Sequence, residues 1–286
     1  MKNQLRNLFC LAILVIASLT TSCSTNDMPP SAQSYQVYEN HIDLAGENNM
    51  RDLGGYVGAN GKRILYHKLY RSGDLSGLTA DDLNSLSKRE IKQVVDFRNE
   101  SERMDKPDKM IDGATYFQLP LIADFSGSSN QSDLITKLFQ GNTVGEGLMI
   151  PLYANISDLE ITNWEKTFDL LETGNTTVLH CTDGKDRTGM TTALVLWSLG
   201  VDQDTIVKDF MLSNSYLSGS NQQTVNYYNS NYGQGVGEYV LPLITVEEGY
   251  IDAFFHAINL KYGGMDNFLK VLKVDTVKMR QFYLEK

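Results

Sequence analysis

The chain has 286 residues, of which 42% are hydrophobic, and a formal net charge of −10. This length is sufficient to bury one sizeable core, so a single elaborated domain is the simplest expectation. The acidic balance and the lack of a basic tract argue against nucleic acid as a partner. Because the overall charge repels anions, any attraction for an anionic substrate must be local to a site.

The first residues have the features of a targeting segment. Basic side chains precede an apolar run from Leu8 to Leu19, which is too short to span a bilayer. Thr20-Thr21-Ser22 and Cys23 follow, an arrangement similar to a bacterial lipoprotein cleavage box except that Thr20 replaces the usual aliphatic residue. We expect a signal peptide over residues 1–22, a lipid on Cys23, and an exported bacterial lipoprotein in the periplasm, the outer membrane or the cell surface. Plain secretion without the lipid is the alternative.

The remainder divides into a tether and a folded domain. Residues 23–40 are polar with two prolines and predict a flexible tether, and the domain is expected over 41–286. A turn at Asn60-Gly61 indicates a hairpin, and Thr79 is a candidate N-cap. The expected strands are 64–70, 91–97, 115–121 and 176–180. Interleaved with helices, they predict an α/β fold with a mostly parallel sheet, helices on both faces and a helical C-terminal part.

The remaining segments are expected to be helices and loops. Helices are predicted over 157–172, 201–214, 246–262, 266–272 and 276–283. A further helix is expected to end at Gly200, directly before the one over 201–214. Residues 221–237 are rich in tyrosine and asparagine and predict a loop. Residues 122–150 give the weakest structural signal. A short helix is expected over 134–140 and a loop over 141–147. This stretch is predicted to be a lid or specificity insertion.

One motif carries the chemistry: His180-Cys181-Thr182-Asp183-Gly184-Lys185-Asp186-Arg187-Thr188-Gly189. It follows an apolar run and opens into a helical sequence, which indicates a strand, a tight loop and a helix. A loop that ends on a helix N-terminus presents backbone N–H groups to an anion. The spacing His-Cys-(five residues)-Arg resembles the signature of the cysteine-dependent phosphatases.

The residue types suit phosphoryl transfer. The helix N-terminus and nearby cations favour the thiolate of Cys181, which would attack phosphorus and form a phosphocysteine. Arg187 offers a planar fork to two phosphate oxygens. The residues between them, Thr182, Asp183, Gly184, Lys185 and Asp186, would surround the phosphate with amides, Gly184 allowing the turn, and Thr188 is placed to hydrogen-bond the thiolate.

Two other interpretations of the motif are weaker. If Cys181 were only a buried structural cysteine, the glycine, lysine, arginine and threonine that match the same motif would remain unexplained. A nucleotide-binding loop would need glycine at Leu179 and serine or threonine at Asp186. Cys10 lies in the leader, and Cys23 is the expected lipidation position. Cys181 is therefore expected to be a free thiol.

Further stretches extend the resemblance. They are "NMRDLGGY", "LYRSG", "VVDFRNESER" and, near the C-terminus, "GYIDAFFHAINLKYGGMDNFL". Together with the loop they are similar to a bacterial tyrosine-phosphatase family whose loop is Cys-x-x-Gly-Lys-Asp-Arg, over about residues 41–285. The resemblance implies that Cys181 is the nucleophile, that Arg187 binds phosphate and that Lys185 and Asp186 line the loop.

The same resemblance matches Asp96 to an aspartate used as general acid. A strand-end carboxylate paired with Arg98 is an equally weighted alternative, and Asp124 and Asp186 are other candidate donors. Arg51 and Asp52 are expected to form a structural ion pair beneath the loop.

Asp183 departs from the family, which often has a small residue there. A carboxylate inside an anion cradle would repel phosphate, so its side chain is expected to point outward.

These observations predict a phosphomonoesterase that needs no metal or other cofactor and acts on a phosphotyrosine protein or peptide. Lys185, as a second cation beside the phosphate, also suits phosphoinositides or dual specificity, and a basic rim would favour that alternative. A catalytically weak phospho-binding module is the other alternative. Membrane contact is expected through the lipid anchor only.

Overall fold

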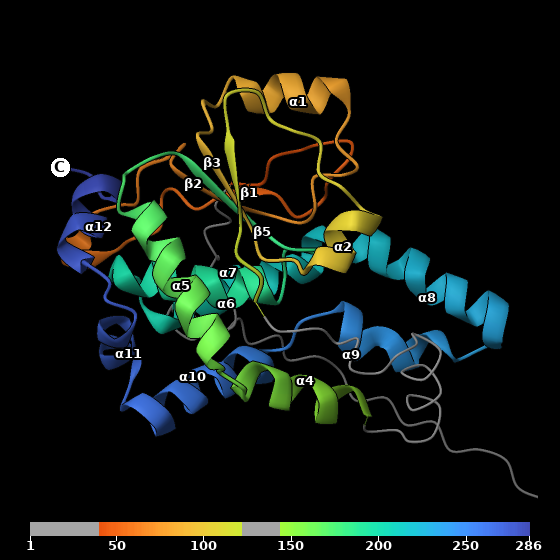
Figure 1. Cartoon of the computed structure of the whole chain (residues 1–286). Coiled ribbons are helices and arrows are strands. Elements are labelled where there is room, and N and C mark those ends of the chain that lie inside the picture. The colour runs from red at the N-terminus through yellow and green to blue at the C-terminus, as the bar shows by residue number, and fades with distance from the viewer. Residues whose placement is uncertain (1–39, 122–143) are drawn as a thin grey trace, which may run out of the picture. The chain divides into compact units, whose positions relative to one another are not determined.

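The computed structural model describes residues 40–121 and 144–286. The described residues belong to one compact unit, Glu39–Lys286. The described part of this unit is a five-stranded sheet with helices on both of its faces (Figure 1). This confirms the predicted α/β class with a mostly parallel sheet.

The sheet sets the position of the signature loop. Its strands are β1 (Arg51–Asp52), β2 (Leu69–Ser72), β3 (Gln93–Asp96), β4 (Thr115–Gln118) and β5 (Thr177–His180), in the order β1-β2-β5-β3-β4. The β1–β2 pair is antiparallel and the other pairs are parallel. Ser72, His180 and Asp96 are aligned across β2, β5 and β3. The loops after these three strands therefore leave the sheet at one edge.

The sheet is buried on both faces because its side chains alternate. Tyr70, Val94 and Val178 belong to a buried cluster that includes Leu86 of α1 (Ala80–Ser87). Val95 and Leu179 point the other way and are fully buried. On that second face lie α5 (Asp158–Leu171), α6 (Arg187–Ser198) and α7 (Gln203–Tyr216), as Figure 1 shows.

The C-terminal part is helical, as predicted. Its helices are α8 (Ser218–Tyr232), α9 (Leu241–Ile244), α10 (Glu248–Tyr262), α11 (Met265–Val271) and α12 (Thr276–Tyr283). Earlier in the chain lie α2 (Glu100–Asp105) and α4 (Val144–Ala154). Two short 3-10 turns, η2 (Ala59–Gly61) and η4 (Gly237–Val240), complete the described elements. Helix α10 packs against α4, α11 and α7. None of the helices in residues 40–121 and 144–286 has the length and apolar character to cross a bilayer.

Local signals fixed several element ends. Thr79 caps α1 as predicted, and its hydroxyl accepts from the Asp82 amide in a capping box. Gly200 follows α6 with a φ of 83°, a left-handed conformation that glycine adopts without strain. At the predicted hairpin turn, Asn60 has a φ of 58°, and an isolated bridge joins Val57 to Arg63.

The strand expected over 64–70 and the loop expected over 221–237 differ from the structure. The strand expected over 64–70 begins only at Leu69, because His67 has a φ of 64° and Ile64 pairs with Leu284 instead of the sheet. The loop expected over 221–237 is mostly the helix α8. Its polar sequence has poor intrinsic helix propensity, but Val225 is buried and the Asn229 side chain accepts from the Gly237 amide. Tertiary contacts thus overrode local preference.

Other predictions fall partly or wholly outside the described residues. These include the signal peptide, Cys23, the tether, Asp124 and the helix over 134–140. Of the predicted insertion over 122–150, the structure describes only the part from Val144 onward. That part is the beginning of α4, so the loop expected over 141–147 is helical from Val144.

Leu86→Ala tests the packing of α1 on the sheet. Leu86 is fully buried, so truncation leaves a cavity and should lower the free energy of unfolding by about 2–5 kcal/mol in urea denaturation. Asn84→Ala, on the exposed side of the same helix, should change it by less than about 0.5 kcal/mol. Equal effects of the two variants would contradict this packing.

Candidate active site

Residues 181–186 form the loop between β5 and α6, at the edge where the parallel strands end. Gly184 turns the chain with a φ of 70°. A Cβ atom at this position would lie 2.3 Å from the carbonyl oxygen of Ser72 in β2. Both the turn and the close approach therefore require glycine, as the sequence predicted.

The carbonyl groups of the loop are bonded on the side that faces the protein. The Asp74 amide donates to the Thr182 carbonyl (2.8 Å), and Asn49 Nδ2 donates to the Asp183 carbonyl (2.8 Å). Arg71 Nη2 donates to the carbonyls of Gly184 (2.7 Å) and Lys185 (3.5 Å). The Met190 amide donates to the Asp186 carbonyl (2.9 Å). Within the described residues, no acceptor meets the backbone N–H groups of residues 182–186. Successive unpaired amides of this kind form an anion-binding concavity.

A buried ion network holds the loop from below. Arg71 donates to Asp209 Oδ2 at 2.6 Å, and Arg51 Nε donates to Asp209 Oδ1 at 3.0 Å. Burial opposes the charge of Asp209, but the two arginines lower its pKa. Burial lowers the pKa of Arg71 to about 10, so it stays cationic at neutral pH. The network joins β1, β2 and α7 to the carbonyls of the loop.

This network corrects one expectation. Arg51 lies beneath the loop as predicted, but its ionic partner is Asp209 on α7 rather than Asp52. The carboxylate of Asp52 instead accepts from the amides of Gly54 (2.8 Å) and His67 (2.7 Å). Adjacent residues of a strand point to opposite faces of the sheet, so the side chains of Arg51 and Asp52 do not meet.

Cys181 begins the loop and is only 2% exposed. Its thiol acts electrostatically on both Lys185 and Arg187 and raises the pKa of each, against the effect of burial. The hydroxyl of Thr188 is buried in the first turn of α6, and among the described residues it has no hydrogen-bond partner. The predicted bond from Thr188 to the thiol is thus not formed in this structure.

Glu102 of α2 orients Arg187. Its Oε2 accepts from Arg187 Nη1 at 2.7 Å and its Oε1 accepts from Nη2 at 2.6 Å. The Thr182 hydroxyl donates to Glu102 Oε1 at 2.6 Å and lies 3.0 Å from Arg187 Nη2. Burial opposes ionisation, but these hydrogen bonds lower the pKa of Glu102 to about 2. The bidentate pair fixes the plane of the guanidinium.

Lys185 is buried and does not present a second cation to a substrate. Its Nζ donates to Asp186 Oδ2 at 2.6 Å and to the carbonyl oxygen of Leu243 in α9 at 2.8 Å. Burial opposes its charge, but Asp186 and Asp183 raise its pKa. This contradicts the expectation that Lys185 stands free beside the phosphate, because its charge is neutralised within the protein.

The two loop aspartates lie in different surroundings. Asp183 is exposed, as expected for this departure from the family pattern. Desolvation by the atoms around the loop raises its pKa; Lys185 opposes this shift and Asp186 adds to it. The side chain of Asp186 is 22% exposed and accepts from the Tyr153 hydroxyl of α4 at 2.6 Å as well as from Lys185.

Asp96 adopts the ion-paired arrangement that the sequence left open. It is 2% exposed, and Arg98 donates to both of its oxygens, with Nη2 at 2.9 Å from Oδ2. His180 lies beside the same group, its Nε2 3.3 Å from Asp108 Oδ2. Asp96, Asp108 and His180 are close enough together to hold a metal ion, but Arg98 also binds Asp108 at 2.8 Å and already supplies the positive charge.

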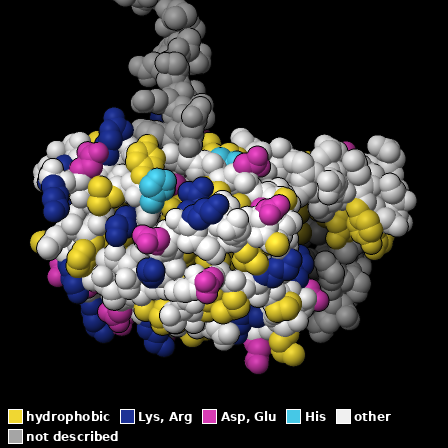
Figure 2. All heavy atoms as spheres, turned by 90° about the horizontal axis from the view of Figure 1, so that it is seen from above, with side chains coloured by type: hydrophobic (Ala, Val, Ile, Leu, Met, Phe, Trp, Pro, Cys, Tyr) yellow, Lys and Arg dark blue, Asp and Glu magenta, His cyan; other side chains and the backbone are white. Residues whose placement is uncertain are grey.

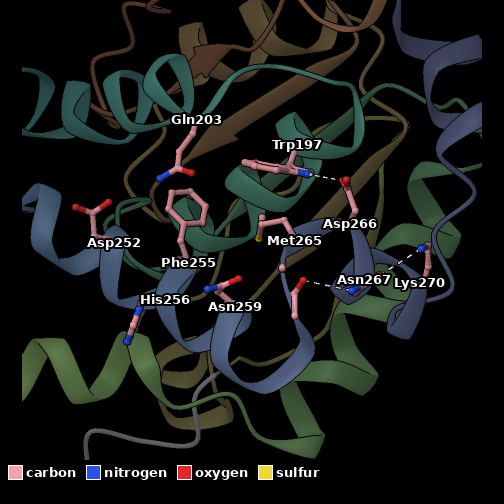
Figure 3. A pocket seen from close by; sticks show the side chains of 12 residues that line it. Trp197, Gln203, Asp252, Phe255, His256, Asn259, Met265, Asp266, Asn267 and Lys270 are labelled. Atoms are coloured by element: carbon pink, nitrogen blue, oxygen red, sulfur yellow. Dashed lines mark hydrogen bonds between the residues drawn. The ribbon is translucent and has the colours of Figure 1, made fainter.

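A separate cavity lies at the other end of α6. It has a volume of about 750 Å³ and is lined by Trp197, Phe255 and Met265 with exposed polar side chains around them (Figure 3). Trp197 follows Arg187 by ten residues, a distance of about 15 Å along the helix. Trp197 donates to Asp266 at 2.9 Å. This cavity contains none of the loop residues and is not the candidate active site.

A thiol at the mouth of an amide-lined loop, with an oriented arginine on the following helix, defines a cysteine-dependent phosphatase. The comparison with known families agrees. Residues 42–285 match the model of the Tyrosine phosphatase family, and the chain belongs to that family.

Its relatives carry corresponding names. A Cupriavidus necator protein named as a tyrosine-protein phosphatase is 32% identical over 270 residues, covering 91% of this chain and 95% of the relative. The triple specificity protein phosphatase PtpB of Mycobacterium tuberculosis is 29% identical over 193 residues, covering 60% and 68%. Among solved structures, TpbA of P. aeruginosa in complex with pTyr is 14% identical, with a TM-score of 0.32 and coverage of 72% and 97%.

Sequence reasoning missed three residues that support the site: Glu102, Asp209 and Tyr153. The sequence does mark Glu102, because Asn99-x-x-Glu102 is a capping-box pattern. This box begins α2, after the strand that carries Asp96. Asp209 and Tyr153 had none, because each reaches the loop from a distant helix and nothing in its local pattern marks it.

Glu102→Gln tests the pair with Arg187. The lowered pKa means that the pair contributes its full stability above about pH 4.5 and loses it as the pH falls toward 2. We expect the variant to unfold more easily than wild type by about 2 kcal/mol at pH 7, and the difference to shrink below pH 4.5. Urea denaturation across pH measures this. A difference that stays constant with pH would contradict the pairing.

Proposed function

We propose that the chain is a protein tyrosine phosphatase that works through a phosphocysteine on Cys181. The observation that carries the proposal is the loop over 182–186, whose carbonyls are tied to the protein while its amides remain available to an anion. The amides would hold the equatorial oxygens of the phosphoryl group and stabilise their charge in the transition state.

In the first step the Cys181 thiolate attacks phosphorus. The S–P bond forms, the P–O bond to the leaving group breaks, and the leaving oxygen takes a proton. Four N–H groups of Arg187 are engaged by Glu102, Thr182 and the Phe97 carbonyl, and no described residue accepts from Nε–H. A phosphate would therefore use Nε–H and replace the Thr182 hydroxyl at Nη2, while Glu102 keeps the guanidinium in place.

Asp183 is the better placed source of the leaving-group proton. A general acid must reach the substrate and must be protonated before the step. Asp96 is buried, and both of its oxygens are bonded to Arg98. Asp183 is exposed on the loop itself, and desolvation raises its pKa toward the range that a general acid needs. The departure from the family at this position then has a catalytic use.

Phosphotyrosine is the substrate that we favour. The family and the names of the relatives support it. The phosphoinositide alternative relied on Lys185 as a second cation, and its ammonium is instead bound to Asp186 and Leu243. On the face shown in Figure 2, basic and acidic side chains are interspersed.

Substitution of Cys181 by serine tests the proposed function. Wild type should release phosphate from a phosphotyrosine peptide faster than from a phosphoserine peptide or a phosphoinositide, in the presence of a chelator. Cys181→Ser should lose at least about 10³-fold in rate, because the nucleophile is the thiolate. Unchanged thermal unfolding of the variant serves as the control. Wild type that binds the phosphopeptide without releasing phosphate would instead support the phospho-binding module.

We also propose that the chain is exported and anchored through a lipid on Cys23. The proposal rests on the leader sequence, in which an apolar run precedes Cys23. Labelled fatty acid should be incorporated into the wild-type protein in a bacterial host, and the protein should be found in the membrane fraction. Cys23→Ser should abolish the label and Cys10→Ser should retain it. Equal labelling of both variants would contradict the anchor.

A further inference from the structure

Tyr153 reaches the loop from outside it. The residue lies near the end of α4, is fully buried, and donates its hydroxyl to Asp186 Oδ1 at 2.6 Å. Lys185 Nζ donates to the other oxygen, Oδ2, also at 2.6 Å. Each oxygen of Asp186 is thus held by a separate donor. Two such donors fix the plane of the carboxylate.

The surroundings of Tyr153 make it a rigid donor. Its ring packs edge-on against Phe210 of α7, with centroids 6.0 Å apart, and against Tyr250 of α10 at 5.7 Å. Burial, together with the charge of Asp186, raises its pKa well above the ordinary value of 10, so the phenol keeps its proton. Tyr153 can therefore orient Asp186 but cannot itself exchange protons near neutral pH.

Asp186 and the nucleophile belong to one cluster. Asp186 and Cys181 both act electrostatically on Tyr153, Lys185 and Arg187. Asp183 also acts on Lys185, and the charge of Asp186 adds to the effect of burial in raising the pKa of Asp183. Asp186 keeps 22% of its side chain exposed, so water can reach it.

Two other carboxylates near the loop are engaged. Asp96 binds Arg98 through both of its oxygens. Glu102 binds Arg187 through both of its oxygens. Each oxygen of Asp186 has one donor among the described residues and, with two lone pairs, can accept a further hydrogen bond from a water molecule.

We propose that Tyr153 is a positioning residue that holds Asp186 as the base of the second catalytic step. The inference rests on the proposed function. A water oxygen attacks the phosphorus of phosphocysteine and the P–S bond breaks. Its electron pair returns to Cys181 as thiolate, one proton of the water passes to Asp186, and phosphate leaves. The proton is then lost from Asp186 to solvent. Asp183 and Asp186 thereby divide the acid and base roles between two steps.

The test separates the two steps with p-nitrophenyl phosphate, whose leaving group needs little protonation. The full chain is mixed rapidly with substrate, nitrophenol is followed in the first turnover and at steady state, and phosphocysteine is located by mass spectrometry after fast denaturation. Tyr153→Phe removes only the hydroxyl. Tyr250→Phe is the matched control, because that buried hydroxyl in the same aromatic cluster donates to the Pro242 carbonyl.

We expect Tyr153→Phe to keep the wild-type burst rate and to lose about 10-fold in steady-state rate, with phosphocysteine accumulating on Cys181. Asp186→Asn should show the same pattern more strongly, and Tyr250→Phe should behave as wild type. A parallel fall of burst and steady-state rates in Tyr153→Phe, or no change in either, would overturn the inference. A wild-type chain that releases no nitrophenol would contradict the proposed function itself.

Discussion

The anion-binding loop depends on the direction of the peptide groups between β5 and α6. Their carbonyl oxygens are bonded to Asp74, Asn49, Arg71 and Met190, all on the protein side. A peptide group whose carbonyl points inward presents its N–H outward, so these bonds create a concavity for an anion before any ligand arrives. Preorganised donors need no reorientation during the reaction, which is the property that electrostatic catalysis requires.

Local charge pairing explains how a chain with a net charge of −10 can hold a phosphoryl group. Buried arginines are each paired: Arg71 and Arg51 with Asp209 below the loop, and Arg187 with Glu102 beside it. Such pairing orients the cations, so that Arg71 donates to the loop carbonyl of Gly184 and Arg187 is held beside the loop. It also makes the site sensitive to the loss of either partner, because a buried unpaired charge is strongly destabilising.

The sequence predicted the parts of the site that lie on one continuous stretch. Cys181, Gly184 and Arg187 occupy positions set by strand, turn and helix, and their spacing is visible in the motif. Lys185 was misread because its direction depends on a contact with Leu243 in α9. Asp209 and Tyr153 were missed because they approach from other helices, and contacts between distant elements leave no periodic signal in one sequence. Helix α8 was missed for the same physical reason, since packing rather than propensity stabilises it.

The most direct measurement follows the loop amides as an oxyanion binds. Backbone ¹⁵N–¹H resonances of the Cys181→Ser protein would be recorded during a titration with inorganic phosphate. The account predicts that the amide resonances of residues 182–186 move together with one dissociation constant, and that the Trp197 indole in the remote cavity does not respond. If phosphate binds but the amide resonances of residues 182–186 do not shift, the loop is not the phosphate site and the central claim is contradicted.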